Sequence, residues 1–270
     1  MIHGLALCSG IGGIDLGLRM ALGPGGYRTV CHVEREAFAA AVLVARMEDK
    51  ALDLAPIWDD LATFRGEPWR GVVDLVSAGF PCQPWSVAGK RKGTEDERWI
   101  WPSIVRIVRE VEPALVFVEN VPGLYRHGLR EVLSDLAALG FDAEWTNLRA
   151  SDVGAPHRRE RLFVLAYHIG GRCYRPATWQ CDSYQERNLE ASEPCRVAVL
   201  REAGTGLQSP WPPGPGRIGS IPRMADGVSD QMDRFRGLGN AVVPAQAAAA
   251  FRELFCLIRR GDGEKEGERG

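Results

Sequence analysis

The chain has 270 residues, of which 45% are hydrophobic and 25% charged, and its formal net charge is −2. This length suits one full α/β domain with a small appendage, and the near-neutral charge excludes a protein that coats nucleic acid nonspecifically. No apolar run approaches the roughly twenty residues that a membrane-spanning helix needs.

Short apolar runs alternate with helical patterns through the first 165 residues. Strands are predicted near 4–8, 29–33, 73–77, 115–118 and 161–166, and helices near 13–22, 36–47, 102–111 and 126–139. Strands that alternate with helices indicate a mostly parallel sheet covered on both faces. In such a sheet, ligands bind beyond the carboxyl ends of the strands, at a switch in strand order.

The pattern changes after about residue 168. Residues 170–223 show little periodicity, and the proline- and glycine-rich run at 209–216 is incompatible with regular structure. A further helix is predicted from Pro244 to Arg260, with proline in its first turn. The charged, glycine-rich residues 261–270 are predicted to be disordered.

The cysteine pattern indicates a reducing compartment. The seven cysteines are irregularly spaced, and the first residues lead directly into an apolar run without a signal-peptide pattern. We therefore expect a soluble, cytoplasmic protein. Cys173, Cys181 and Cys195 lack the close Cys-x-x-Cys spacing of a zinc site, so no metal is predicted.

Two candidate reactive groups follow predicted strands. Cys82 lies between Pro81 and Pro84, which keep the chain out of regular structure and leave the thiol on a loop. Glu119 follows the strand at 115–118. A cysteine considered alone is most often a small buried hydrophobe, and a glutamate at a strand end is most often a solvated charge. Together, at the ends of two strands, they indicate a nucleophile and a carboxylate that serve one site.

This arrangement resembles the DNA (cytosine-5) methyltransferase family, and motifs similar to those of that family occur in the same order from about residue 5 to residue 255. They are Leu7-Cys8-Ser9-Gly10-Ile11-Gly12-Gly13, Val33-Glu34, Trp58-Asp59-Asp60-Leu61, Pro81-Cys82-Gln83 with Ser86, Glu119-Asn120-Val121, Pro156-His157-Arg158-Arg159-Glu160-Arg161, and Gly239-Asn240-Ala241-Val242.

The resemblance implies an α/β fold, namely a Rossmann-like S-adenosylmethionine-dependent methyltransferase domain with a small, irregular target-recognition insertion. Residues 1–168 would form the catalytic and cofactor-binding domain, and residues 169–225 the target-recognition region, which is short for that role. Residues 226–260 would form a return segment whose helix packs on the catalytic domain.

The implied reaction is methylation of carbon 5 of a cytosine that is flipped out of a specific duplex DNA sequence. Cys82 would add to carbon 6 of the ring as a thiolate. Glu119 would serve ring nitrogen 3 in its protonated form, which requires a pKa raised by burial. Arg161, with Arg159 as second choice, would bind the exocyclic oxygen, while Glu160 would point the other way.

The implied methyl donor is S-adenosylmethionine. Its binding residues would be Cys8, Gly10, Ile11, Gly12, Gly13, Glu34, Asp60, Leu61, Pro81, Asn240 and Ala241. Glu34 would hold the ribose hydroxyls and Asp60 the adenine amino group, with Asp59 as the alternative. Gln83, Ser86, Lys90 and Arg91 would contact double-stranded DNA, and residues 84–98 would close as a lid.

Three alternatives remain open. A glycine turn followed by an acid about twenty residues later also fits a dinucleotide site. The RNA-directed branch of the resembled family shares the cysteine and the glutamate, but typically has a Cys-Phe-Thr motif that is absent here. A non-catalytic binding module is opposed by the intact Cys82, Glu119 and Arg161.

The chain also departs from the family pattern at three positions. Cys8 stands where a phenylalanine commonly packs against adenine, His157 replaces a glutamine, and Trp85 replaces a phenylalanine. None of these changes removes a group that performs the chemistry. We expect a monomer of bacterial, phage or mobile-element origin, which would act alone, protect such an element, or partner a cognate restriction endonuclease.

Overall fold

The computed structural model describes residues 1–81, 99–168 and 241–267. In chain order the elements are β1 (Ile2–Leu7), α1 (Gly13–Leu22), β2 (Tyr27–Val33), α2 (Ala37–Glu48), β3 (Ile57–Trp58), the 3-10 helix η1 (Glu67–Trp69), β4 (Leu75–Gly79), α3 (Trp101–Val111), β5 (Leu115–Asn120), α4 (Gly123–His127), α5 (Leu129–Ala138), β6 (Phe141–Arg149), the 3-10 helix η4 (Ala150–Val153), β7 (Glu160–His168) and α8 (Pro244–Gly267).

Within these ranges, seven strands form one sheet in the order β3-β2-β1-β4-β5-β7-β6. The first five strands are parallel, and β7 runs antiparallel to both β5 and β6. The strand order switches direction between β1 and β4, which is where open α/β sheets bind ligands. Because β7 is antiparallel, its first residues lie at the carboxyl edge of β5, where Leu162 pairs with Asn120.

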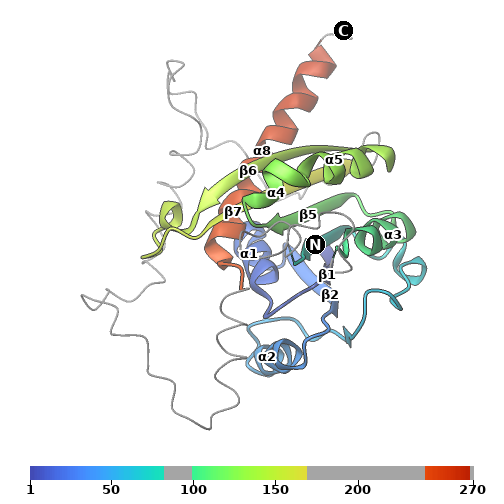
Figure 1. Ribbon diagram of the computed structural model, residues 1–270, viewed down its shortest axis with the longest axis vertical. Helices are drawn as coiled ribbons and strands as arrows, with labels where there is room; N and C mark the ends of the chain where they lie inside the picture. Colours follow the sequence, from blue (N-terminus) through green and yellow to red (C-terminus); the bar gives the residue numbers. More distant parts are fainter. Residues whose placement is uncertain (82–98, 169–240, 268–270) are drawn as a thin grey trace.

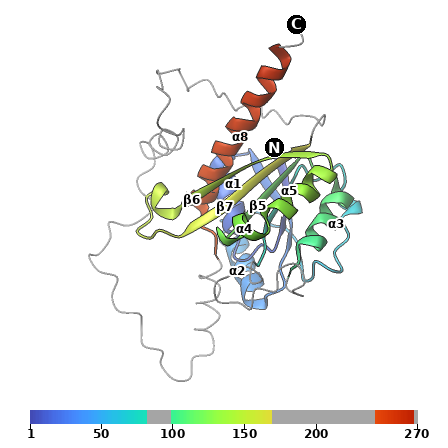
Figure 2. The same cartoon turned by 45° about the horizontal axis from the view of Figure 1, so that its top comes forward.

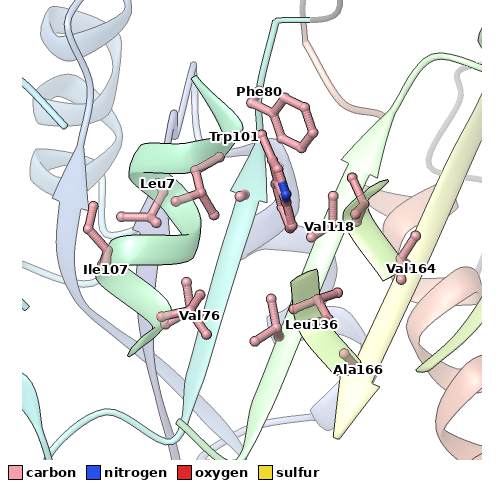
Figure 3. Packing of buried hydrophobic residues seen from close by; sticks show 14 of the residues in the cluster. Leu7, Val76, Phe80, Trp101, Ile107, Val118, Leu136, Val164 and Ala166 are labelled. Atoms are coloured by element: carbon pink, nitrogen blue, oxygen red, sulfur yellow. The ribbon is translucent and has the colours of Figure 1, made fainter. Parts of the chain in front are cut away.

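Helices cover both faces of the sheet (Figures 1 and 2). On one face, α3, α4 and α5 bury apolar side chains against the strands, and Figure 3 shows Trp101, Ile107 and Leu136 packed over Val76 and Val118. On the other face, α1 and α8 form a second core that includes Leu18 and Phe251. In the described ranges, helices therefore cover both faces of the sheet.

Helix α8 approaches α1 closely because both helices carry small residues where they meet. A Cβ at Gly17 would lie 2.6 Å from the Cβ of Ala247 and 2.7 Å from the carbonyl oxygen of Pro244. At Gly13 a Cβ would collide with the carbonyl oxygen of Val242. These two glycines fix the return of the chain against the helix that follows the glycine-rich turn.

The structure differs from the predicted elements in four places. Strand β3 was not predicted, because its two residues make no pattern. Strand β6 was not predicted, because it is an edge strand that mixes polar and apolar residues and lacks a continuous apolar run. The single helix predicted at 126–139 is divided into α4 and α5 at Gly128. Helix α8 is assigned from Pro244 to Gly267, beyond the predicted helix end at Arg260.

The sequence of this last part of α8 contains opposing preferences. Glu264, Lys265 and Glu266 are good helix formers, whereas the glycines at 261, 263 and 267 disfavour a helix. The end of the helix projects away from the sheet in both views (Figures 1 and 2). No helix in the described part of the chain is long and apolar enough to cross a membrane.

Candidate active site

The ends of β4 and β5 lie side by side at the carboxyl edge of the sheet, where Gly79 pairs with Glu119. A Cβ at Gly79 would lie 3.5 Å from Oε2 of Glu119 and 3.2 Å from Cδ1 of Ile14. Glycine at this position therefore leaves space in front of the carboxylate. Two residues further on, Pro81 is exposed and is the last described residue before Cys82.

Glu119 is buried and paired with an arginine from the neighbouring strand. Nε of Arg161 lies 2.9 Å from Oε1 of Glu119, and the two side chains are only 16% and 8% exposed. Burial raises the pKa of Glu119 to about 7, and the charges of Arg161 and Arg159 oppose that shift. A carboxyl group that titrates near neutral pH can hold or release a proton, as general acid–base chemistry requires.

Glu160 points away from this pair. Its carboxylate is largely exposed and lies 3.8 Å from Nε of Arg149. Alternation along β7 therefore places Arg161 toward Glu119 and Glu160 on the opposite side, as the sequence predicted.

Arg159 immediately precedes β7 and is held by the return segment. Its Nη2 donates a hydrogen bond of 2.6 Å to the carbonyl oxygen of Ala241. Desolvation lowers the pKa of Arg159, with a further lowering by the charge of Arg161. Ala241, which was predicted to contact the cofactor, thus contacts an arginine of the candidate base-binding site.

Asn120 had no role in the sequence-based prediction, yet it connects the two strand ends. Its Nδ2 donates to the carbonyl oxygen of Phe80 at 3.2 Å, and its Oδ1 accepts the N–H of Val121 at 2.8 Å. The Phe80 ring packs against Trp99 and Trp101, with centroids 5.6 and 5.4 Å apart; Figure 3 shows the contact with Trp101. These contacts fix the backbone that leads to Cys82. A polar residue directly after the candidate carboxylate was the available sequence signal.

The turn after β1 adopts a backbone that favours glycine. The φ angle is 53° at Gly10 and 80° at Gly12, and Cys8 also has a positive φ of 51°. A Cβ at Gly10 would meet no atom within 4 Å, so open space lies beside this residue. The carbonyl oxygen of Ile11 accepts a hydrogen bond from Arg46 of α2, which steadies the turn.

Glu34 follows β2 and faces the glycine-rich turn. Its Oε2 accepts the N–H of Gly10 at 2.7 Å, and its Oε1 accepts the N–H of Glu36 at 2.8 Å. A carboxylate has about four lone-pair sites, so this one has capacity for further donors. Burial, together with the nearby Glu34 charge, raises the pKa of the Cys8 thiol far above its ordinary value. The Cys8 thiol is therefore neutral; it lines this turn and does not act as a nucleophile.

Asp60 and Leu61 follow β3 at the same edge. Oδ1 of Asp60 accepts the N–H of Ala62 at 2.9 Å, whereas the alternative, Asp59, is exposed. Leu61 packs against the core, and its carbonyl oxygen accepts a hydrogen bond of 2.7 Å from Arg106. The structure thus brings the candidate cofactor residues of β1, β2 and β3 to one edge of the sheet.

The remaining predicted site residues are Cys82, Gln83, Ser86, Lys90, Arg91 and Asn240, and they lie outside the described residues, as do the target-recognition region and the cysteines at 173, 181 and 195. In the described ranges, no group of three or more His, Cys, Asp and Glu side chains could hold a metal ion.

Comparison with known proteins identifies similar chains. A family described as "C-5 cytosine-specific DNA methylase" matches residues 2–194. The type II methyltransferase M.AplI of Arthrospira platensis is 32% identical over 304 residues, covering 93% of this chain and 84% of that protein. The type II methyltransferase M.NgoMIV of Neisseria gonorrhoeae is 34% identical over 166 residues, covering 60% of this chain and 50% of its own length.

The chain therefore spans only about half the length of the Neisseria relative. Among solved structures, the S. pombe Dnmt2 methyltransferase has a TM-score of 0.51 at 22% identity, covering 72% of this chain and 58% of that chain. At this identity the likeness concerns the fold, which is that of a Rossmann-like methyltransferase.

Proposed function

Because the chain belongs to the C-5 cytosine-specific DNA methylase family, we propose that it methylates carbon 5 of cytosine within a specific sequence of double-stranded DNA. The observation that carries this proposal is the buried Glu119–Arg161 pair, which lies beside the end of the strand that leads to Cys82. Carbon 5 of cytosine is a poor nucleophile and needs both a covalent nucleophile at carbon 6 and a partner at ring nitrogen 3.

In the proposed reaction, the thiolate of Cys82 forms a bond to carbon 6, and the electron pair displaced from the ring double bond makes carbon 5 nucleophilic. Glu119 places its proton at nitrogen 3, where negative charge would otherwise accumulate. Arg161 donates hydrogen bonds to the exocyclic oxygen and holds the ring against Glu119. Carbon 5 takes the methyl group, and the donor sulfur is left as a neutral thioether. The carbon 5 proton then passes to solvent, its bonding pair restores the ring double bond, and sulfur leaves carbon 6 as the thiolate. Nitrogen 3 returns its proton to Glu119.

The methyl donor in this proposal is S-adenosylmethionine, which supplies an electrophilic methyl group on a sulfonium sulfur. The open space beside Gly10 and the carboxylate of Glu34 fit such a ligand. Glu34 would accept hydrogen bonds from the ribose hydroxyls, and Asp60 or Asp59 from the adenine amino group. Cys8, Ile11, Leu61 and Pro81 would form apolar walls, with Gly12 and Gly13 shaping the turn and Asn240 and Ala241 closing the site.

Duplex DNA is the substrate that the family description and the type II relatives favour. The lack of a Cys-Phe-Thr motif also argues against an RNA substrate. Gln83, Ser86, Lys90 and Arg91 remain the candidate DNA contacts because they follow the cysteine in sequence.

Bisulfite sequencing of DNA from cells that express the protein tests the proposal. We expect protected cytosines in one sequence context with the wild-type protein and none with Cys82→Ala, because that variant lacks the nucleophile. Genomic DNA without any protected context, from cells with folded wild-type protein, would contradict the proposal.

A further inference from the structure

Gln246, in the first turn of α8, is fully buried and connects two strands of the sheet. Its Nε2 donates hydrogen bonds of 2.6 Å to the carbonyl oxygen of Leu148 and 3.0 Å to that of Arg159. Leu148 lies near the end of β6, and Arg159 immediately precedes β7. Two carbonyl acceptors fix the orientation of the amide, because the flipped amide would place oxygen against oxygen.

The segment of residues 241–246, which includes Gln246, also holds the side chain of Arg159. Its guanidinium donates to the carbonyl oxygen of Ala241, and its own carbonyl oxygen additionally accepts the N–H of Ala150 at 3.0 Å. The main chain and the side chain of Arg159 are therefore both bound by residues 241–246. This arrangement leaves Arg159 little freedom to move relative to α8.

The amide of Gln246 is not explained by packing alone. Its Oε1 is buried and has no hydrogen-bond partner in the described part of the protein, which is an unfavourable state for a polar atom. A methionine would fill nearly the same volume without this cost. We therefore attribute the presence of an amide at this position to the two hydrogen bonds that it donates.

Both hydrogen bonds of Gln246 hold main-chain carbonyl groups close to Arg161. In the pairing of β6 with β7, Leu148 is the residue directly opposite Arg161, and Arg159 lies two residues before it. We propose that Gln246 is a positioning residue, which sets where Arg161 meets Glu119 by fixing the main chain at Arg159, two residues before it, and at Leu148, opposite it on β6. The consequence for catalysis rests on the proposed function.

The inference can be measured because the pKa of Glu119 depends on the charged groups near it. Arg161 and Arg159 hold its pKa down against burial. If β7 shifts so that Arg161 moves away, burial acts with less opposition, and the pKa of Glu119 rises. A change that merely destabilises the fold, without moving Arg161, leaves that pKa where it was.

The experiment compares Gln246→Met with Thr146→Val in the full-length protein. Thr146 is a matched control because its buried Oγ1 donates to Oε1 of Glu253, another hydrogen bond between β6 and α8, at a position of β6 that pairs with Phe163 instead of Arg161. Two quantities are measured for folded protein: the midpoint of the Glu119 carboxyl titration, by NMR of ¹³C-labelled glutamate with Glu119→Gln as assignment control, and kcat for methyl transfer to duplex DNA.

For Gln246→Met we expect a midpoint above that of the wild type and a kcat lower by roughly ten- to a hundredfold, since small misplacements of reacting groups have effects of this order. For Thr146→Val we expect neither change. If Gln246→Met does not fold, Gln246→Asn keeps a buried amide with a shorter reach and undergoes the same comparison.

A variant at Gln246 that folds with the wild-type midpoint and kcat, or that behaves like Thr146→Val, would overturn the inference. Failure of the proposed function is distinguishable, because it would appear as a wild-type protein that transfers no methyl group to any duplex. The titration midpoint still tests the position of Arg161 in that case.

Discussion

Glu119 is a single carboxyl group under two opposing influences. Burial favours the neutral acid, whereas Arg161, 2.9 Å away, and Arg159 favour the carboxylate. If burial acted alone, the carboxyl group would keep its proton throughout the physiological pH range. If the two arginines acted alone, the carboxyl group would stay ionised throughout that range. The balance leaves a group that gains and loses a proton near neutral pH, which suits a transient partner for ring nitrogen 3.

The first prediction concerns Glu119→Gln. The amide is nearly the same size and donates a hydrogen bond, but it cannot deliver a proton. We expect the single-turnover rate of methyl transfer to fall by roughly 10²-fold or more, the usual scale for loss of a general acid. Unchanged turnover would mean that another group serves nitrogen 3.

A second prediction is the titration of the same residue in the free protein. The pKa of Glu119 is raised from 4.5 to about 7, so its carboxyl ¹³C signal should titrate near pH 7 and be absent from Glu119→Gln. Because the folded state binds this proton more tightly, the group stabilises the fold below about pH 4.5 and loses that contribution as pH rises through about 7. A midpoint near 4.5 would show that Glu119 is solvated or more strongly paired.

At the scale of elements, the close approach of α1 and α8 places the return segment against the sheet. Gly17 meets Ala247 and Pro244 at distances that leave no room for a methyl group. The contact matters for the proposed function because α8 begins at Pro244, and Gln246 in its first turn donates a hydrogen bond to the carbonyl oxygen of Arg159.

We therefore predict that Gly17→Ala lowers the free energy of unfolding by about 1–3 kcal/mol, the usual cost of overpacking a tight contact. Helix propensity alone predicts the opposite sign, because alanine stabilises a helix relative to glycine by about 1 kcal/mol. Chemical denaturation followed by circular dichroism measures the difference. A more stable variant would show that α8 can retreat from α1 without cost.

The elements also show what the sequence can and cannot predict. β4 and β5 were predicted from continuous apolar runs, because buried parallel strands leave no other pattern. β6 was missed because it is an edge strand with polar residues among its apolar ones, and β3 because two residues make no pattern. The antiparallel direction of β7, which brings Arg161 to Glu119, depends on pairing between distant segments and has no local signal.

The residues of the candidate site were also predicted only in part. Glu119 and Arg161 were predicted, through the family resemblance, to serve different atoms of one cytosine ring, and the structure places the two side chains in contact. Asn120 and Gln246 were missed because both act by hydrogen bonds to the main chain of distant residues, at Phe80 for one and at Leu148 and Arg159 for the other. The sequence shows that Asn120 is a polar residue next to Glu119, but the main-chain acceptors that Asn120 and Gln246 contact have no sequence signature and become visible only in a structure.

At the scale of the whole molecule, the parallel strands and the antiparallel β7 collect every described candidate residue along one edge of the sheet. The described residues of this edge serve the proposed base and cofactor sites, whereas residues 170–223, between β7 and α8, show the least periodicity in the sequence. Target selection is therefore expected to reside in the segment between β7 and α8.

We predict that exchange of residues 170–222 for the matching region of a relative changes the methylated sequence and leaves the chemistry unchanged. The catalytic and cofactor motifs all lie outside this interval. Bisulfite sequencing with the chimaera reads the new target directly. A chimaera that is active on the original sequence would assign specificity to residues 84–98 or to the arginines at 158, 159 and 161.

The most direct test of the central claim is capture of the covalent bond between Cys82 and carbon 6. A 5-fluorocytosine in the target sequence cannot lose its fluorine as a cation, so the adduct cannot be released and should accumulate. Wild-type protein, this duplex and S-adenosylmethionine should give a denaturant-resistant complex, with the link at Cys82 and an added methyl group on the base by mass spectrometry. Cys82→Ala should bind the duplex reversibly and give none. A wild-type protein that binds the target duplex and the cofactor but never forms the adduct would contradict the account.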